Sequence, residues 1–277
     1  MLPSTLTDQL TAFRAGDGQL TIMTGAGISA ESGIPTFRGP EGYWTVGSKE
    51  YHPQEMATYA MFTKHPDEVW QWYLYRLSVC RNAEPNQAHF ALVEMEKILQ
   101  DRLTLITQNV DNLHIQAGSN PERTFQIHGN IFFMRCTNEC QQRLITLPLE
   151  LFPRGKDQPL SVEDKNLLKC PDCGAGTRPH VLWFDESYDE HYFKFESAMA
   201  VANKTDVLII AGTSGATTLP NHVANMVYQN QGTIIDINIE SNPFTELALN
   251  SNHGEFLNMS CSEGFAKILA AIKKESL

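Results

Sequence analysis

Four cysteines stand in two close pairs whose spacing is typical of a metal site. Three residues separate Cys136 from Cys140, two separate Cys170 from Cys173, and 29 lie between the pairs. Two tight turns that each present two thiolates supply the soft ligands that tetrahedral zinc prefers. Because all four ligands come from protein, we predict a structural Zn²⁺ and not a catalytic one. The alternatives are free core cysteines or two disulfides, which a reducing compartment disfavours.

A glycine-bearing turn follows the apolar run LTIM at residues 20–23. It fits the dinucleotide-binding pattern G-x-G-x-x-A, and its residues are Gly25, Ala26, Gly27, Ile28, Ser29 and Ala30. In that pattern the glycines let the backbone approach a pyrophosphate at a helix N-terminus. A tight strand-to-helix turn is the alternative interpretation. The acid that usually binds the ribose about 20 residues further on is replaced by a loop at 33–50 that is rich in Pro, Gly and aromatic residues.

Polar side chains follow two further apolar runs. Gln108, Asn109 and Asp111 come directly after LTLIT at 103–107, and His128 ends TFQIH at 124–128. Ligands of open α/β sheets bind at the carboxyl ends of the strands, and histidine is suited to act as a general base near pH 7. A turn with an Asx cap explains the first group equally well, and the chain has nine histidines.

Two turns after later strands complete the candidate ligand site. Gly212, Thr213 and Ser214 follow the run at 207–211, and Asn238, Ile239 and Glu240 follow TIIDI at 233–237. Small and polar residues at strand ends can receive a ribose, a phosphate or a base edge. A simple turn and a helix cap are the alternatives for these two segments.

The elements that must position these residues alternate between strand and helix. Apolar spacing predicts helices at about 5–13, 53–61, 65–81, 86–99, 190–203, after Thr217 and at the C-terminus, and strands at 20–23, 103–107, 124–128, 181–184, 207–212, 233–238 and 255–259. This order predicts an α/β fold with a Rossmann-like parallel sheet domain and a smaller inserted zinc-binding domain. We assign residues 1–35, 86–130 and 178–277 to the first, and 36–85 and 131–177 to the second.

Composition excludes several classes of protein. The chain has 277 residues, 42% of them apolar, and a formal net charge of -11. An acidic chain without a basic run is a poor partner for nucleic acid, so we expect none. No stretch reaches the roughly 18 apolar residues of a membrane span, and the N-terminus lacks the apolar core of a signal peptide. We therefore expect a cytoplasmic protein that does not bind membranes.

The order of the motifs resembles the sirtuin family. The resemblance rests on GAGISAESGIPTFRG at 25–39, TQNVDNLH at 107–114, HGN at 128–130, the paired cysteines, RPHVLWF at 178–184, GTS at 212–214 and NIE at 238–240. It covers about residues 18–265. It implies an NAD-dependent protein lysine deacylase that takes acyl-lysine proteins or peptides as substrates, with NAD as co-substrate and a structural zinc.

Residue roles follow from the same resemblance. It implies that His128 is the general base and that Asn109 and Asp111 complete the catalytic set. The residues implied to bind NAD are Gly25 to Ala30, Phe37, Arg38, Trp44, Gln108, Asn109, Asp111, Gly212, Thr213, Ser214, Asn238, Ile239, Glu240 and Cys261. The resemblance implies that nicotinamide leaves first, that His128 then removes a proton from a ribose hydroxyl, and that the products are free lysine and an O-acyl-ADP-ribose. An ADP-ribosyltransferase or NAD glycohydrolase using the same pocket, and an NAD sensor without turnover, are the competing interpretations.

Two residues of the helix predicted at 65–81 bear on the acyl group. Tyr73 and Arg76 are three apart and share a helix face, and they resemble the Y-x-x-R pair of sirtuins that remove acidic acyl groups. A phenol and a guanidinium suit a distal carboxylate, so we predict a desuccinylase or demalonylase with possible deacetylase activity. The alternative is a surface ion pair of Arg76. The resemblance places Val181, Trp183 and Phe184 at the substrate, and Asp185 stands where the family has glycine, so we expect its carboxylate to border the substrate tunnel.

Overall fold

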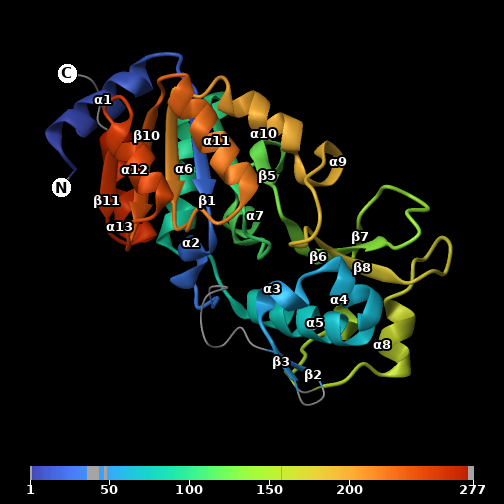
Figure 1. Cartoon of the computed structure of the whole chain (residues 1–277). Coiled ribbons are helices and arrows are strands. Elements are labelled where there is room, and N and C mark those ends of the chain that lie inside the picture. The colour runs from blue at the N-terminus through green and yellow to red at the C-terminus, as the bar shows by residue number, and fades with distance from the viewer. Residues whose placement is uncertain (1, 36–43, 47–48, 157, 274–277) are drawn as a thin grey trace.

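The computed structural model describes residues 2–35, 44–46, 49–156 and 158–273, which form a larger and a smaller part (Figure 1). The larger part holds a parallel sheet between layers of helices, and the chain ends lie on its far side from the smaller part. This architecture confirms the predicted fold class. No helix in the described ranges combines the length and the apolar character needed to cross a membrane.

Six parallel strands form the large sheet, in the order β11, β10, β9, β1, β4, β5. Aliphatic residues dominate them because helices cover both faces, and every residue of β1 and β9 is buried. The strands are β1 Leu20–Thr24, β4 Leu103–Thr107, β5 Thr124–Gln126, β9 Val207–Ala211, β10 Thr233–Asn238 and β11 Glu255–Asn258.

Helices pack on both faces of this sheet (Figure 1). One face carries α1 Ser4–Ala15, α6 Gln87–Leu99 and α13 Cys261–Lys273, with Leu10, Leu92 and Phe265 buried in a shared core. The other carries α10 Phe195–Ala202, α11 Thr218–Gln229 and α12 Pro243–Asn250. Three short helices complete this part, and they are α2 Ala26–Ala30, α7 Leu113–Ala117 and α9 Glu190–Phe193.

The order in which the chain adds strands to the sheet changes direction between β1 and β9, although all six strands are parallel. From β1 the chain order runs outward through β4 and β5, and from β9 it runs the opposite way through β10 and β11. Such a switch point leaves a crevice at the carboxyl ends of the two central strands, where open α/β sheets bind ligands. The turn at 25–30 leaves β1 and the turn at 212–214 leaves β9, so both predicted glycine turns lie at this crevice.

The smaller part is built from an antiparallel sheet and a group of helices. The sheet has the order β7, β6, β8, and a separate hairpin pairs β2 with β3. Its elements are β2 Trp44–Val46, β3 Lys49–Tyr51, α3 Pro53–Met56, α4 Tyr59–Lys64, α5 Pro66–Asn82, β6 Gly129–Cys136, β7 Ile145–Thr146, α8 Val162–Leu167 and β8 Thr177–Val181. Trp70, Leu74 and Met134 lie in the core between α5 and this sheet.

Three expected elements differ in the structure. The strand expected at 181–184 is β8 at Thr177–Val181, which pairs with β6 in the small sheet and not with the parallel sheet. The helix expected at 53–61 is two helices, because the amide of Phe184 donates to Ala57 O at 3.0 Å and Thr58 caps α4. The helix expected at 190–203 is interrupted at Lys194, whose φ is 55°.

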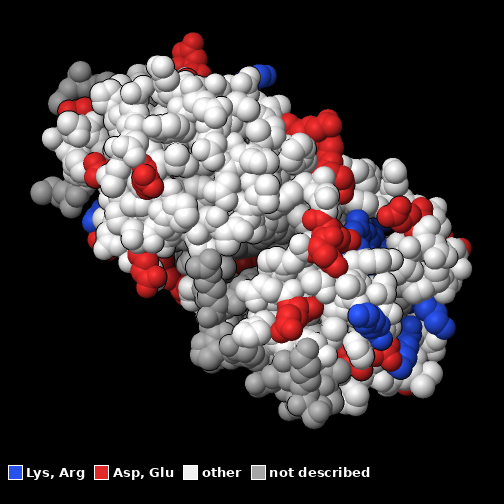
Figure 2. All heavy atoms as spheres, in the orientation of Figure 1, with Lys and Arg blue, Asp and Glu red and all other residues white. Residues whose placement is uncertain are grey.

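Charge is unevenly distributed over the face shown in Figure 2. Acidic side chains occur on both parts, whereas most of the basic ones on this face lie on the smaller part, beside acidic ones. Ion pairs there join Arg143 to Asp172 at 3.0 Å and Lys165 to Asp67 at 2.6 Å. Positive charge on this part is therefore compensated locally.

A pair of buried histidines links α6 to α7. The rings of His89 and His114 lie 4.8 Å apart, and both side chains are almost fully buried. Among the residues that the structure describes, His89 Nε2 and His114 Nδ1 have no hydrogen-bond partner. Burial lowers the pKa of His89 to about 4, and burial together with His89 lowers the pKa of His114. Both rings are therefore neutral in the folded protein.

We predict that the free energy of unfolding falls as the pH drops from about 6.5 to about 4. In this window the unfolded chain takes up protons that the folded chain does not, so acid favours unfolding. Between pH 7 and pH 4, the free energy of unfolding should fall by about 3 kcal/mol less in the variant His89→Gln than in the wild type. Urea unfolding at several pH values measures this, with the exposed His222→Gln as the control. If the free energy of unfolding falls with pH equally steeply in His89→Gln and in the wild type, the prediction is wrong.

Candidate active site and metal centre

The two glycine turns are in direct backbone contact at the switch point. The Gly25 amide donates to Ala211 O at 3.0 Å, and the Gly27 amide donates to Gly212 O at 2.7 Å. A Cβ on Gly27 would lie 2.6 Å from Gly212 Cα, and Gly212 itself has a φ of 61°. Glycine is therefore required here by the contact between the turns, independently of any ligand. The short helix α2 begins at Ala26, directly after Gly25, as the motif predicts.

Asn109 and Asp111 join this turn to the segment after β4. Asp111 Oδ2 accepts the Ser29 hydroxyl at 2.6 Å, and its Oδ1 accepts the Leu113 amide at 3.0 Å. Asn109 Nδ2 donates to Gly25 O at 3.1 Å and to Ser29 Oγ at 3.0 Å. Burial raises the pKa of Asp111, against the hydrogen bond from Ser29. Both oxygens of the carboxylate are thus engaged inside the protein, and they fix the position of the loop.

Gln108 connects the same segment to the turn after β9. Its Nε2 donates to Thr213 Oγ1 at 2.9 Å, and its Oε1 accepts the Thr217 hydroxyl at 3.0 Å. Asn238, at the end of β10, donates through Nδ2 to Thr213 O at 2.8 Å. The ends of β1, β4, β9 and β10 are therefore tied together by side-chain amides.

The remaining residues predicted to bind NAD differ in exposure. Ala26 and Ser214 are half-buried, Ile28 and Ser29 are buried, and Ala30 is exposed at the end of α2. Ile239 and Glu240 are exposed after β10, whereas Cys261 is buried at the first residue of α13. Phe37 and Arg38 lie outside the described residues, and Trp44 is in β2 with its side chain outside the described part.

His128 lies beside the end of β4, at the start of β6. Its Nδ1 is 3.0 Å from Gln108 O, and its Nε2 is 2.8 Å from the hydroxyl of Tyr188. The next residue, Gly129, has a φ of 84°, and a Cβ there would lie 2.3 Å from His180 O, so only glycine fits. Burial lowers the pKa of His128 to about 4, outweighing the hydrogen bond to Gln108. A neutral imidazole of this kind can accept a proton.

Tyr73 and Arg76 lie one turn apart on α5, as the spacing predicts. The Tyr73 hydroxyl is buried and accepts a hydrogen bond from Trp183 Nε1 at 2.9 Å. The Arg76 guanidinium is 5.2 Å from the centre of the Trp72 ring. Burial lowers the pKa of Arg76, while Tyr73 and Asp111 are among the groups that raise it. This pair therefore lies close to the loop that carries Asp111.

The three residues predicted to contact substrate, which lie at and just after the end of β8, have different environments. Val181 is buried in the small sheet opposite Gly129, and Trp183 is 1% exposed against Phe62 of α4. Phe184 is 56% exposed. Of the three residues predicted to contact substrate, Phe184 is thus the one with the most accessible side chain.

Asp185 caps the start of α4. Its Oδ1 accepts the Tyr59 amide at 2.7 Å, and its Oδ2 accepts the Ala60 amide at 3.0 Å. These amides are in the first turn of α4, which has no internal acceptors for them. Both carboxylate oxygens are therefore occupied by the protein, and the negative charge is held at the start of α4.

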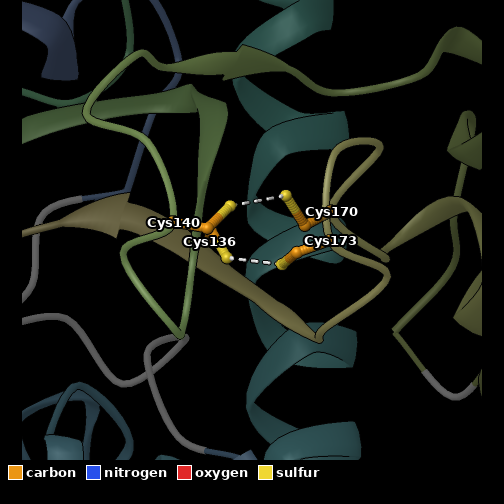
Figure 3. A group of neighbouring side chains, drawn as sticks. All are labelled: Cys136, Cys140, Cys170 and Cys173. Carbon is orange, nitrogen blue, oxygen red and sulfur yellow. Dashed lines mark hydrogen bonds between the residues drawn. The ribbon is translucent and has the colours of Figure 1, made fainter.

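The four paired cysteines converge at one point of the smaller part (Figure 3). Their sulfur atoms all lie within 4.8 Å of one another, and two of the separations are 3.5 Å and 3.6 Å. Tetrahedral coordination with Zn–S bonds of about 2.3 Å requires sulfurs about 3.8 Å apart. All six cysteines of the chain are free of disulfides. The donor set fits structural zinc, as the sequence predicts.

Two residues around His128 and Gln108 were not found by sequence reasoning. Tyr188, five residues after Trp183, contacts His128, and Thr217 contacts Gln108. Neither stands in a glycine turn or at the end of a predicted strand. The only sequence signal for Tyr188 is a phenol shortly after the RPHVLWF block, which by itself indicates no contact.

Comparison with known proteins gives consistent matches. A sequence model of the Sir2 family matches residues 25–218. A protein named NAD-dependent protein deacylase from Leptospira interrogans is 39% identical over 251 residues, which cover 90% of this chain and 94% of the relative. A protein of the same name from Pyrococcus furiosus is 37% identical over 268 residues, 97% of this chain and 98% of the relative. A solved Sir2 homologue in complex with NAD has a TM-score of 0.79 at 35% identity, and the match covers 96% of this chain and 93% of that one.

We predict one zinc ion per chain and a strong dependence of stability on it. Removing the metal leaves four thiolates that repel one another, so chelation should lower the melting temperature by about 10 °C or more. Elemental analysis and thermal unfolding with and without a chelator measure both quantities. Cys140→Ser should lose the metal, whereas Cys80→Ala, which lies outside the cluster, should keep it. A metal-free protein with unchanged melting temperature would disprove the zinc assignment.

Proposed function

The chain belongs to the Sir2 family, as an NAD-dependent protein-lysine deacylase, and we propose that it removes acidic acyl groups such as succinyl and malonyl from lysine. Its substrates are acyl-lysine proteins or peptides, and deacetylation is a secondary activity. The observation that carries the proposal is the placement of Tyr73 and Arg76 one turn apart on α5, with the Tyr73 hydroxyl held by Trp183.

The two side chains offer complementary groups to a carboxylate. The Tyr73 oxygen already accepts a hydrogen bond from the indole N–H of Trp183, so the hydroxyl proton of Tyr73 is available to donate. Burial raises the pKa of Tyr73, so the phenol stays protonated. Arg76 supplies a cation with several donors and keeps its charge at neutral pH. A phenol O–H and a guanidinium together suit the distal carboxylate of a succinyl or malonyl group.

Asp185 does not oppose an acidic acyl group in this arrangement. A free carboxylate next to the acyl group would repel it, but both oxygens of Asp185 are bound by amides of α4. The partial positive charge at the start of a helix stabilises a carboxylate in that position. Asp185, which replaces the family glycine, therefore anchors α4 to the segment after β8. In this proposal Arg76 sets the charge of the acyl site.

We further propose that His128 is the general base and that the tied strand ends bind NAD. NAD supplies the glycosidic bond whose cleavage releases nicotinamide and exposes the ribose carbon to the acyl oxygen. Backbone groups of the turn at 25–30 are suited to a pyrophosphate, because glycines there leave no side chain in the way. Asn109 and Asp111 hold this turn against the segment that follows β4, and His128 is neutral and can accept a proton from a ribose hydroxyl.

The acyl preference is tested with Arg76→Met. Losing a charged hydrogen-bond donor costs about 1.5–3 kcal/mol, so kcat/KM for a succinyl-lysine peptide should fall about 10- to 100-fold. The value for the matched acetyl-lysine peptide should change by less than about threefold, because an acetyl group has no carboxylate for Arg76 to bind. Product formation is followed by mass spectrometry. Arg81→Met, on the exposed end of the same helix, is the control. Equal losses on both peptides would show that Arg76 has a structural role only.

The role of His128 is tested with His128→Asn. The asparagine amide can still donate to Gln108 O, so the fold is preserved while the base is lost. Deacylation should fall by at least about 10²-fold, while exchange of labelled nicotinamide into NAD continues, since that step precedes the proton transfer. His222→Asn is the control.

Two results of this experiment would change the assignment. Unchanged deacylation by His128→Asn would remove His128 from the role of base. Nicotinamide release by the wild type without any acyl-lysine substrate would favour an ADP-ribosyltransferase or an NAD glycohydrolase using the same pocket.

A further inference from the structure

Tyr188 connects the imidazole of His128 to the start of α11. Its hydroxyl is 2.8 Å from His128 Nε2, accepts a hydrogen bond from the Leu219 amide and lies beside the Thr217 side chain. Thr217 donates its proton to Gln108 Oε1 at 3.0 Å, and the Gln108 carbonyl contacts His128 Nδ1 at 3.0 Å. Tyr188, His128, Gln108 and Thr217 therefore lie in one polar cluster.

The direction of each hydrogen bond around His128 is determined by the groups themselves. A carbonyl oxygen only accepts, so His128 Nδ1 carries a proton and donates it to Gln108 O. The ring is neutral, so Nε2 has a lone pair and no proton. Nε2 therefore accepts, and the Tyr188 hydroxyl is the donor. The one lone pair of Nε2 is directed at Tyr188.

The Tyr188 hydroxyl is also firmly held. It contacts His128 before β6, and it accepts a hydrogen bond from the Leu219 amide in the first turn of α11. The Tyr188 ring packs on the rings of His128 and Phe195, with centroids 5.8 Å and 6.5 Å away. Swinging the phenol out would break its hydrogen bond to His128 and would leave the Leu219 amide without this acceptor.

We propose that Tyr188 is a proton relay between the ribose hydroxyl of the substrate and His128. The inference rests on the proposed role of His128 as base. Since Nε2 has a single lone pair and the Tyr188 hydroxyl occupies it, a proton reaches His128 through the Tyr188 oxygen.

The relay conserves protons and electron pairs. The ribose O–H bond breaks, and its proton forms a new O–H bond on Tyr188 Oη. In the same step the original Tyr188 O–H bond breaks, and its proton forms an N–H bond on His128 Nε2, which gives an imidazolium that still donates to Gln108 O. The ribose oxygen keeps the electron pair of its O–H bond and uses it to attack the acyl carbon. Because Thr217 donates its own proton to Gln108 Oε1, one lone pair of Tyr188 is open to the incoming hydroxyl.

The experiment compares Tyr188→Phe with the wild type on the favoured acyl-lysine peptide. Phenylalanine keeps the ring and its packing on Phe195 and removes only the hydroxyl. We expect kcat to fall about 10²-fold, with KM for NAD and the rate of nicotinamide exchange changed by less than about threefold. The proton inventory, which is the dependence of kcat on the deuterium content of the solvent, should be curved in the wild type and linear in Tyr188→Phe, because two protons move together in the first and one in the second. Tyr228→Phe, on the exposed side of α11, is the control.

The outcomes separate the relay from the role of the base. If His128→Asn abolishes deacylation and Tyr188→Phe keeps the kcat of the wild type, the relay is wrong and the base stands. If Tyr188→Phe lowers KM for NAD or raises kcat, the hydroxyl is a placeholder that the substrate displaces, which also overturns the relay. If His128→Asn is fully active, His128 is not the base, and the relay, which rests on that role, is wrong as well.

A second variant guards against an effect on folding. Thr217→Val keeps the shape of the side chain and removes the hydroxyl that lies beside Tyr188 and donates to Gln108. It should lower kcat less than Tyr188→Phe does, with an unchanged melting temperature. A loss of kcat in Tyr188→Phe that is matched by an equal loss of nicotinamide exchange would show a structural effect and contradict the relay.

Discussion

The contact between the two glycine turns is the constraint on which the rest of the site depends. β1 and β9 are neighbours in a parallel sheet, so the segments leaving their carboxyl ends start about 4.8 Å apart. The turns can pass each other only because Gly27 and Gly212 have no side chains at their point of contact. A methyl group at either position would separate the turns and move α2 away from β9. The glycines that suit a pyrophosphate are thus the glycines that the sheet itself needs.

The polar residues around this contact are organised before any ligand binds. Ser29, Asn109 and Asp111 hold the first turn, and Gln108 with Asn238 holds the second. Buried polar groups of this kind are costly unless each has a partner, and here they satisfy one another. His128 enters the same network through the carbonyl of Gln108, so its tautomer is fixed by the backbone. A site of this kind needs little rearrangement to position a substrate.

The sequence predicted the parts that follow from local pattern and missed those that depend on distant contacts. Aliphatic runs such as LTLIT and VLIIA predicted the strands of the large sheet, since a strand buried on both faces must be apolar. The helix expected at 53–61 is interrupted at Ala57 because residues 184 and 185 bind its backbone, and no residue near 57 indicates this. The contact between Tyr188 and His128 joins residues 60 apart. Side-chain contacts of that range have no periodic signal in a sequence.

The partners of the carboxylates explain why Asp185, which stands where the family has glycine, is compatible with an acidic substrate. Asp185 is held by two amides of α4, Glu186 is paired with Arg178, and Asp111 is held by Ser29 and the Leu113 amide. These three negative charges are therefore stabilised by fixed donors of the protein. Because backbone amides carry no net charge, they stabilise Asp185 without using a lysine or an arginine. The negative charge of Asp185 is thus held at the start of α4, which is compatible with the proposed binding of a substrate carboxylate by Arg76.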